Sequence, residues 1–74
     1  MSLVFMERDT YFRVRDHKGE VLGWLIKPDL SNPNNSFVFS GQVENEQDLN
    51  TTDLKEAIHK VTAIVVAHKL TAAP

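Results

Sequence analysis

The chain has 74 residues and no cysteine. Its length predicts one small domain over residues 1–74. The absence of cysteine excludes disulfides and thiolate metal sites. A domain of this size buries only about 60% of its unfolded surface, so its core gains from contact with another chain. The formal net charge of −2 argues against a surface built to bind DNA. The sequence shows neither a signal-peptide start nor a run of roughly 20 apolar residues, which predicts a cytoplasmic protein without membrane contact.

Residues 10–16 and 21–27 are rich in β-branched and aromatic side chains and predict two strands joined as a hairpin. The connecting loop is expected over His17–Gly19, because its glycine adopts a positive φ without steric strain. Asp16 would then lie opposite Glu20 at the end of the hairpin ladder.

Counting outward from this loop pairs Val14 with Leu22 and Phe12 with Trp24, and sorts the hairpin into two faces. The inner face is expected to hold Phe12, Val14, Leu22, Trp24 and Ile26. The outer face is expected to hold Tyr11, Arg13, Arg15, Val21, Gly23, Leu25 and Lys27.

Residues 36–44 alternate in polarity and predict a third strand. Its inward side chains would be Phe37, Phe39 and Val43, and its outward ones Val38, Ser40 and Gln42. Gly41 within this run indicates a bulge or a close backbone approach. Residues 2–6 are candidates for a further edge strand, and the acidic stretch 43–48 is expected to be a solvated loop.

A helix is predicted over residues 53–71, where Asp53 and Glu56 resemble a capping box and Thr51 and Thr52 are rival caps. Steps of about 100° per residue gather an apolar stripe that would lie on the sheet. This stripe consists of Leu54, Ala57, Ile58, Val61, Ile64, Val65 and His68. Residues 61–66 are β-branched and would also suit a strand, but the helical period that continues upstream favours a helix.

These elements predict an α+β fold: a three-stranded antiparallel β-meander, or four strands with residues 2–6, packed by one C-terminal α-helix. A second apolar stripe lies on the side of the helix roughly opposite the first. It consists of His59, Ala63, Val66 and Leu70. Scattered apolar residues are normal on a surface, yet a single protomer has nothing to cover this stripe. It therefore predicts an oligomer interface, with a two-fold homodimer as the default.

No catalytic, metal or cofactor site can be assembled from the sequence. Of the three histidines, His59 and His68 are nine residues apart, which is about 180° around a helix. His17 falls in the hairpin loop, so the ligands do not converge as a zinc site requires. Neither a nucleophile elbow nor a phosphate-binding glycine loop is visible. The expectation is a protein that is not an enzyme and needs no cofactor.

The outer face of the sheet is the candidate surface for a partner. Its expected residues are Tyr11, Arg13, Arg15, Val21, Leu25, Lys27 and Val38. Arginines mixed with aliphatic side chains suit a protein partner, and this predicts a non-enzymatic protein-interaction module with an accessory or regulatory role. The alternative is weak nucleic-acid binding, because arginines beside an aromatic residue on a β-ribbon can contact bases. In element order, though not in sequence motif, β-β-β-α is similar to the sheet-reading DNA-binding modules of phage-type integrases and AP2-type plant proteins.

Overall fold

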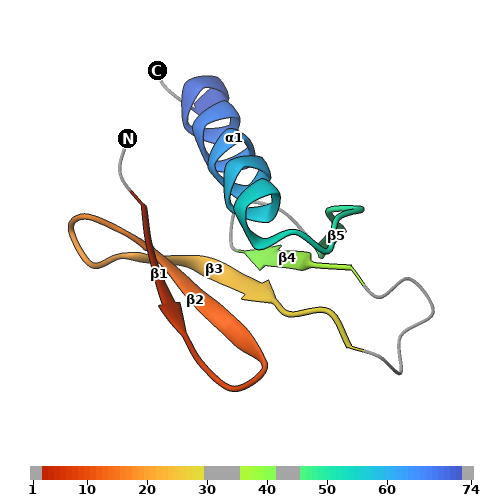
Figure 1. The fold of residues 1–74 in the computed structure, drawn as a ribbon. Helices are drawn as coiled ribbons and strands as arrows, with labels where there is room; N and C mark the ends of the chain where they lie inside the picture. The colour runs from red at the N-terminus through yellow and green to blue at the C-terminus, as the bar shows by residue number, and fades with distance from the viewer. Residues whose placement is uncertain (1–2, 30–35, 42–45, 73–74) are drawn as a thin grey trace.

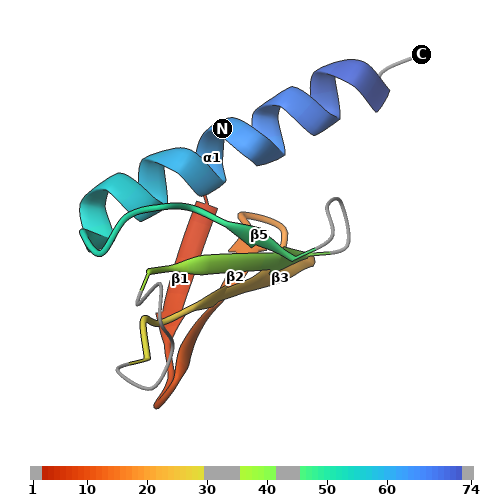
Figure 2. The same cartoon turned by 90° about the vertical axis from the view of Figure 1, so that its right-hand side faces the viewer.

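The computed structural model describes residues 3–29, 36–41 and 46–72, with side chains as far as residue 68. Within these residues, five strands form one antiparallel sheet whose spatial order follows the chain. They are β1 (Leu3–Glu7), β2 (Tyr11–Asp16), β3 (Val21–Ile26), β4 (Val38–Gly41) and β5 (Gln47–Asp48). The helix α1 (Leu54–Ala72) lies across one face of the sheet, and none of the described elements covers the other face (Figure 1, Figure 2). The predicted α+β class, with its meander and C-terminal helix, is confirmed.

The strand β1 confirms the N-terminal edge strand suggested by residues 2–6. It pairs antiparallel with β2 along its whole length. Leu3 and Phe5 pack against the core. Val4 and Met6 point to the opposite side, because alternate residues of a strand face opposite ways.

The β2–β3 turn forms over the predicted loop. The backbone N–H of Asp16 donates to the Glu20 carbonyl at 3.0 Å, so these two residues lie opposite each other as expected. Gly19 has a φ of 93°, a left-handed conformation that glycine adopts most easily. The buried Asp16 carboxylate accepts hydrogen bonds from the amides of Lys18 and Glu20, both at 2.9 Å. This side chain therefore organises the turn by bonding to its backbone.

Beyond the turn, the register of β3 differs from the prediction by one residue. The ladder steps from the Arg15–Val21 pair to the Val14–Gly23 pair, which inserts one extra β3 residue as a β-bulge. The predicted pairing of Val14 with Leu22 is therefore wrong.

The bulge exchanges the two faces of the remainder of β3. Leu25 lies opposite Phe12 and is fully buried, although the sequence placed it on the outer face. Trp24 and Ile26 were expected inside and point outward instead, which leaves Trp24 39% exposed. A one-residue slip reverses every side chain of a strand, so this single bulge accounts for all of these errors.

Two glycines allow β3 and β4 to approach closely. Gly23 and Gly41 lie opposite each other in the ladder. A Cβ atom at Gly23 would lie 2.6 Å from the Gly41 Cα and 2.6 Å from the Ser40 carbonyl oxygen. A Cβ atom at Gly41 would lie 2.8 Å from the Leu22 carbonyl oxygen. The close backbone approach predicted at Gly41 is confirmed, and its partner is the glycine next to the bulge.

The core lies between the inner face of the sheet and α1. Its buried apolar side chains are Phe12, Val14, Leu22, Leu25, Phe37, Phe39, Leu49, Ala57, Val61 and Val65. The inward positions predicted for Phe37 and Phe39 are confirmed, whereas Gln42 and Val43 lie outside the described residues.

The acidic stretch 43–48 is not entirely the solvated loop that was expected. Its last two residues form β5, which pairs with β4. The following Leu49 is buried, and its N–H donates to the Phe37 carbonyl at 2.9 Å. The Phe37 N–H in turn donates to the Thr51 carbonyl at 2.9 Å. Backbone pairing thus holds this polar segment against β4 and brings an apolar residue into the core.

The helix α1 begins one residue after its predicted start. Asp53 is the N-cap, because its carbonyl accepts the first helical hydrogen bond from the Ala57 N–H at 2.9 Å. The Asp53 N–H donates to Thr51 Oγ1 at 3.1 Å, so this threonine supports the helix start from outside. In a capping box, the Asp53 N–H would donate to the Glu56 side chain instead. The hydrogen bond to Thr51 takes the place of that contact.

The apolar stripe of α1 faces the sheet as predicted. Ala57, Val61 and Val65 are fully buried, and Ile58 and Ile64 pack against the core as partly buried residues. His68 is half-buried. Leu54, the first residue of α1, is the exception at 38% exposed. Its assignment to the core stripe was wrong.

Candidate interaction surface

The outer sheet face is the side of β1–β4 that α1 does not cover (Figure 2). Strand alternation and the observed register place on it Val4, Met6, Tyr11, Arg13, Arg15, Val21, Trp24, Ile26, Val38 and Ser40. Each of these residues is exposed or half-buried, in contrast to the buried residues of the inner face.

One row of side chains crosses this face at right angles to the strands. Met6 lies opposite Arg13, which lies opposite Trp24. Trp24 in turn lies opposite Ser40 on β4. Opposing Cβ atoms in such a row are about 5 Å apart, so neighbouring side chains interact. The exposed Arg13 is therefore flanked by a thioether on one strand and an indole on the other.

The row forms the centre of an apolar patch. Trp24 is 39% exposed and Met6 is 37% exposed. Single exposed apolar residues are normal, but these two share a row and are bordered by the half-buried Tyr11 and Ile26. From strand spacing and rise, the face measures roughly 20 by 20 Å, or about 400 Å². This area includes Arg13, Arg15 and Ser40, so the apolar patch is only a part of the face. Exposed apolar patches that are bordered by polar residues are common at interaction sites.

The charge on the outer sheet face is positive. Its charged residues are Arg13 and Arg15, which lie two positions apart on β2. The acidic Asp48 shares this side of the sheet, but it lies on β5 at the far edge, opposite Val38. Its Oδ1 already accepts the Ser36 hydroxyl at 2.6 Å. A chain with a formal charge of −2 thus has two arginines on the sheet face that the described elements leave open.

Arg15 has an unusual environment within this face. Its Nε is buried and has no hydrogen-bond partner among the described residues. Its guanidinium lies toward the hairpin turn, since a Cβ atom added at Gly19 would be 3.9 Å from its Nη1. A buried donor without an acceptor costs free energy, and such groups in native proteins call for an explanation.

A hollow of about 430 Å³ lies beside the central row. It is lined by Thr10, Tyr11, Trp24, Ile26 and Ser40. Two aromatic side chains, one aliphatic side chain and two hydroxyl-bearing residues thus line an open depression that has room for an apolar side chain.

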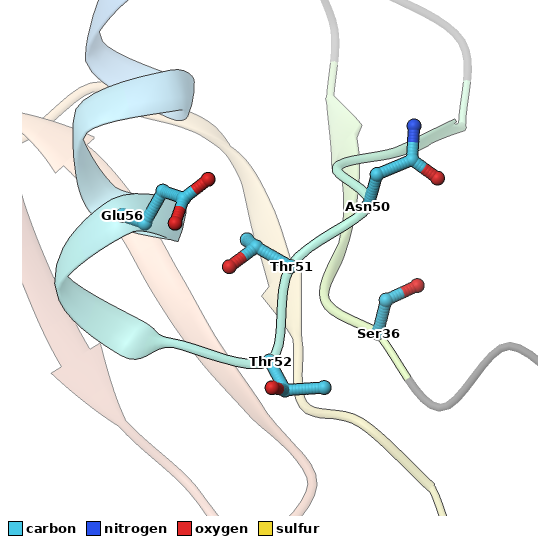
Figure 3. Close-up of a pocket in the computed structure, with 5 residues that line it drawn as sticks. All are labelled: Ser36, Asn50, Thr51, Thr52 and Glu56. Carbon is cyan, nitrogen blue, oxygen red and sulfur yellow. The ribbon is translucent and has the colours of Figure 1, made fainter.

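A second hollow, of about 470 Å³, lies at the start of α1 and is polar (Figure 3). It is lined by Ser36, Asn50, Thr51, Thr52 and Glu56. Its buried hydroxyls already have partners: Ser36 donates to Asp48, and Thr51 accepts from Asp53. The backbone N–H of Asn50, whose φ is 55°, also donates to Asp48 Oδ1 at 2.8 Å. These contacts hold the connection between β5 and α1, so we assign this hollow a structural role.

Lys27 was predicted on the outer face and lies at the end of the inner side instead. Its Nζ is 2.9 Å from Glu7 Oε2 and 5.1 Å from the centre of the Phe12 ring. Glu7 lies opposite Phe12 in the ladder, so the ion pair closes this end of the core. A charged hollow of about 840 Å³ lies beside it at the β1–β2 turn, lined by residues 7–11 and Lys27.

Most of the predicted partner-binding residues do share one surface. The outer sheet face contains Tyr11, Arg13, Arg15, Val21 and Val38, but neither Leu25 nor Lys27. The residues that the sequence reasoning missed are Val4, Met6, Trp24 and Ile26. For Trp24 and Ile26 the available signal was Gly23, because an isolated glycine within a strand indicates a bulge.

The second stripe of α1 points away from the core. His59 and Ala63 are exposed and Val66 is half-buried. The side chain of Leu70 lies outside the described residues. Figure 2 shows that the C-terminal part of α1 projects beyond the sheet.

Within residues 3–29, 36–41 and 46–72, no three His, Asp or Glu side chains converge as ligands of a metal ion. No helix in the same residues combines the length and apolar character needed to cross a membrane. Comparison of the chain with protein-family models, curated proteins and solved structures finds no match.

Proposed function

We propose that this chain is a non-enzymatic protein-interaction module whose binding surface is the outer sheet face. The observation that carries the proposal is the row formed by Met6, Arg13 and Trp24 on a sheet face that none of the described elements covers. The centres of protein interfaces are enriched in aromatic residues, Met and Arg and depleted in Lys, Asp and Glu. Trp, Tyr and Arg also supply most of the residues that dominate binding energy. The outer sheet face has this composition, and its role would be accessory or regulatory, in the cytoplasm.

Weak nucleic-acid binding is the second candidate. Tyr11 and Trp24 could stack on bases while Arg13 and Arg15 contact phosphates. Two arginines would neutralise only about two phosphates, however, and most of the affinity for nucleic acid comes from such contacts. The composition of the face therefore favours a protein.

The proposal includes a homodimer formed through α1. Its support is the exposure of His59 and Ala63 and the partial exposure of Val66 on the side away from the sheet. Light scattering across a concentration series tests this directly, and a dimer mass is the expected result. Ala63→Glu should return the mass to that of a monomer without loss of the fold, because this residue is exposed. A monomer at all concentrations would remove the homodimer from the proposal.

Site-specific photo-crosslinking inside cells tests both surfaces together. A benzophenone amino acid would replace Met6 on the outer sheet face, Ala63 on α1, or the exposed Lys18 in the hairpin turn as the control. We expect an adduct with another protein from position 6 and an adduct of twice the chain mass from position 63. Equal adducts from positions 6 and 18 would contradict the assignment of the outer sheet face. A nuclease-sensitive adduct from position 6 would favour the second candidate.

A further inference from the structure

We infer that the outer sheet face binds a short acidic segment of a partner protein, with a carboxylate on Arg13 and an adjacent apolar side chain in the hollow beside Trp24. This inference rests on the proposed function and adds the chemistry of the partner.

The position of Arg13 favours a carboxylate. The side chain is exposed, it projects from the middle of an apolar row, and the residues opposite it on both sides are uncharged. A carboxylate can bind a guanidinium with two parallel hydrogen bonds. When a ligand covers Met6 and Trp24, it also excludes water around the pair, and the lower local dielectric strengthens the attraction.

Arg15 adds a second positive position on the same strand. Its Cα lies about 7 Å from that of Arg13, because the two residues are two positions apart on one side of β2. Its buried Nε lacks an acceptor in the free chain. A second acidic residue of the ligand would interact with the positive charge of this half-buried guanidinium.

The dimensions of the surface favour a short segment. The outer sheet face offers about 400 Å², whereas each partner of a stable complex of folded domains usually contributes about 800 Å². An extended peptide of a few residues fits the smaller area. The hollow of about 430 Å³ lined by Tyr11, Trp24 and Ile26 provides the pocket for its apolar side chain.

A second copy of this chain is a poor occupant of the same surface. Packing two outer sheet faces together would bring Arg13 and Arg15 of both copies into one interface. Among the described residues, the acidic one on this side is Asp48, whose Oδ1 accepts hydrogen bonds from the Ser36 hydroxyl and the backbone N–H of Asn50. Like charges in a desolvated interface are unfavourable, so charge complementarity selects a different, acidic partner.

A randomised 12-residue peptide library displayed on phage, selected against the full chain, tests the inference. The chain contains one tryptophan, Trp24, so its fluorescence reports binding on the outer sheet face directly. We expect the enriched peptides to carry Asp or Glu beside a large apolar residue and to change this fluorescence. Replacing the acidic residue of a synthetic peptide by its amide should weaken binding by about tenfold.

Arg13→Ala should weaken the acidic peptide by the same factor and leave its amide version unchanged, since only one of them makes the charged contact. Arg8→Ala is the matched control, because it removes the same charge from the exposed β1–β2 turn and should change affinity less than twofold.

Enriched peptides without acidic residues that still change Trp24 fluorescence would overturn the inference and leave the proposed function standing. Peptides that leave the fluorescence unchanged and bind Arg13→Ala as tightly as the original chain would overturn both. Failure to enrich any peptide, or tighter Arg13-dependent binding of oligo-dT, would also overturn the inference.

Discussion

Replacing Leu25 by Ala should destabilise the fold by about 3 kcal/mol. This side chain is fully buried on the central strand, opposite Phe12 on one side and Phe39 on the other. Removing its isopropyl group forfeits about 2.5 kcal/mol of transfer free energy, at about 0.8 kcal/mol per methylene. The cavity that remains adds to this cost, since core Leu→Ala changes span about 2–5 kcal/mol. For 74 residues the total stability is roughly 4–11 kcal/mol, so the loss is a large fraction.

Leu54→Ala is the matched control, because it removes the same atoms from a leucine that is 38% exposed. It should cost about 1 kcal/mol. Urea unfolding followed by far-ultraviolet circular dichroism measures both variants. With a slope of about 1 kcal/mol per molar urea, the midpoint should fall by about 3 M for Leu25→Ala and about 1 M for the control. If Leu25→Ala costs no more than Leu54→Ala, then Leu25 is not in the core and the β3 bulge is wrong.

Three further substitutions test other parts of the fold. Gly23→Ala should cost at least about 3 kcal/mol of stability or prevent folding, because its Cβ would lie 2.6 Å from backbone atoms of β4. A thermal midpoint within a few degrees of that of the original chain would contradict this close approach. Ser36→Ala should cost about 1–2 kcal/mol in urea unfolding, since its buried hydroxyl donates to the Asp48 carboxylate at 2.6 Å. An unchanged urea midpoint would mean that water replaces this contact. Glu7→Gln should lower the free energy of unfolding by less than about 0.5 kcal/mol, because its ion pair with Lys27 is exposed to solvent. A loss above about 1 kcal/mol would show that this pair stabilises the end of the sheet more than exposed pairs normally do.

The bulge in β3 links the fold to the proposed function. Without it, Trp24 would pack inside and Leu25 would be exposed, as the simple alternation predicted. With it, the larger aromatic side chain lies on the uncovered side next to Arg13. Bulges are frequent where a sheet redirects a side chain for function, and here the redirected residue is the centre of the candidate surface.

The sequence by itself determined the features that depend on local chemistry. The hairpin turn follows from Asp16 and Gly19, and the α1 stripe follows from the period of Ala57, Val61 and Val65. These features were correct because the residues that cause them are close together in the chain. The two arginines of the outer sheet face were placed correctly for the same reason, since β2 alternates without interruption.

Only the tertiary structure decided the register of β3 and the pairing of β5. The bulge places Gly23 opposite Gly41, where two backbones meet that are distant in the sequence. The polar β5 forms because β4 offers it backbone partners, and its burial of Leu49 depends on that pairing. Alternation in a single strand carries no information about an inserted residue or about a partner strand. The orientation of Trp24, and with it the character of the candidate surface, was therefore set by contacts between strands.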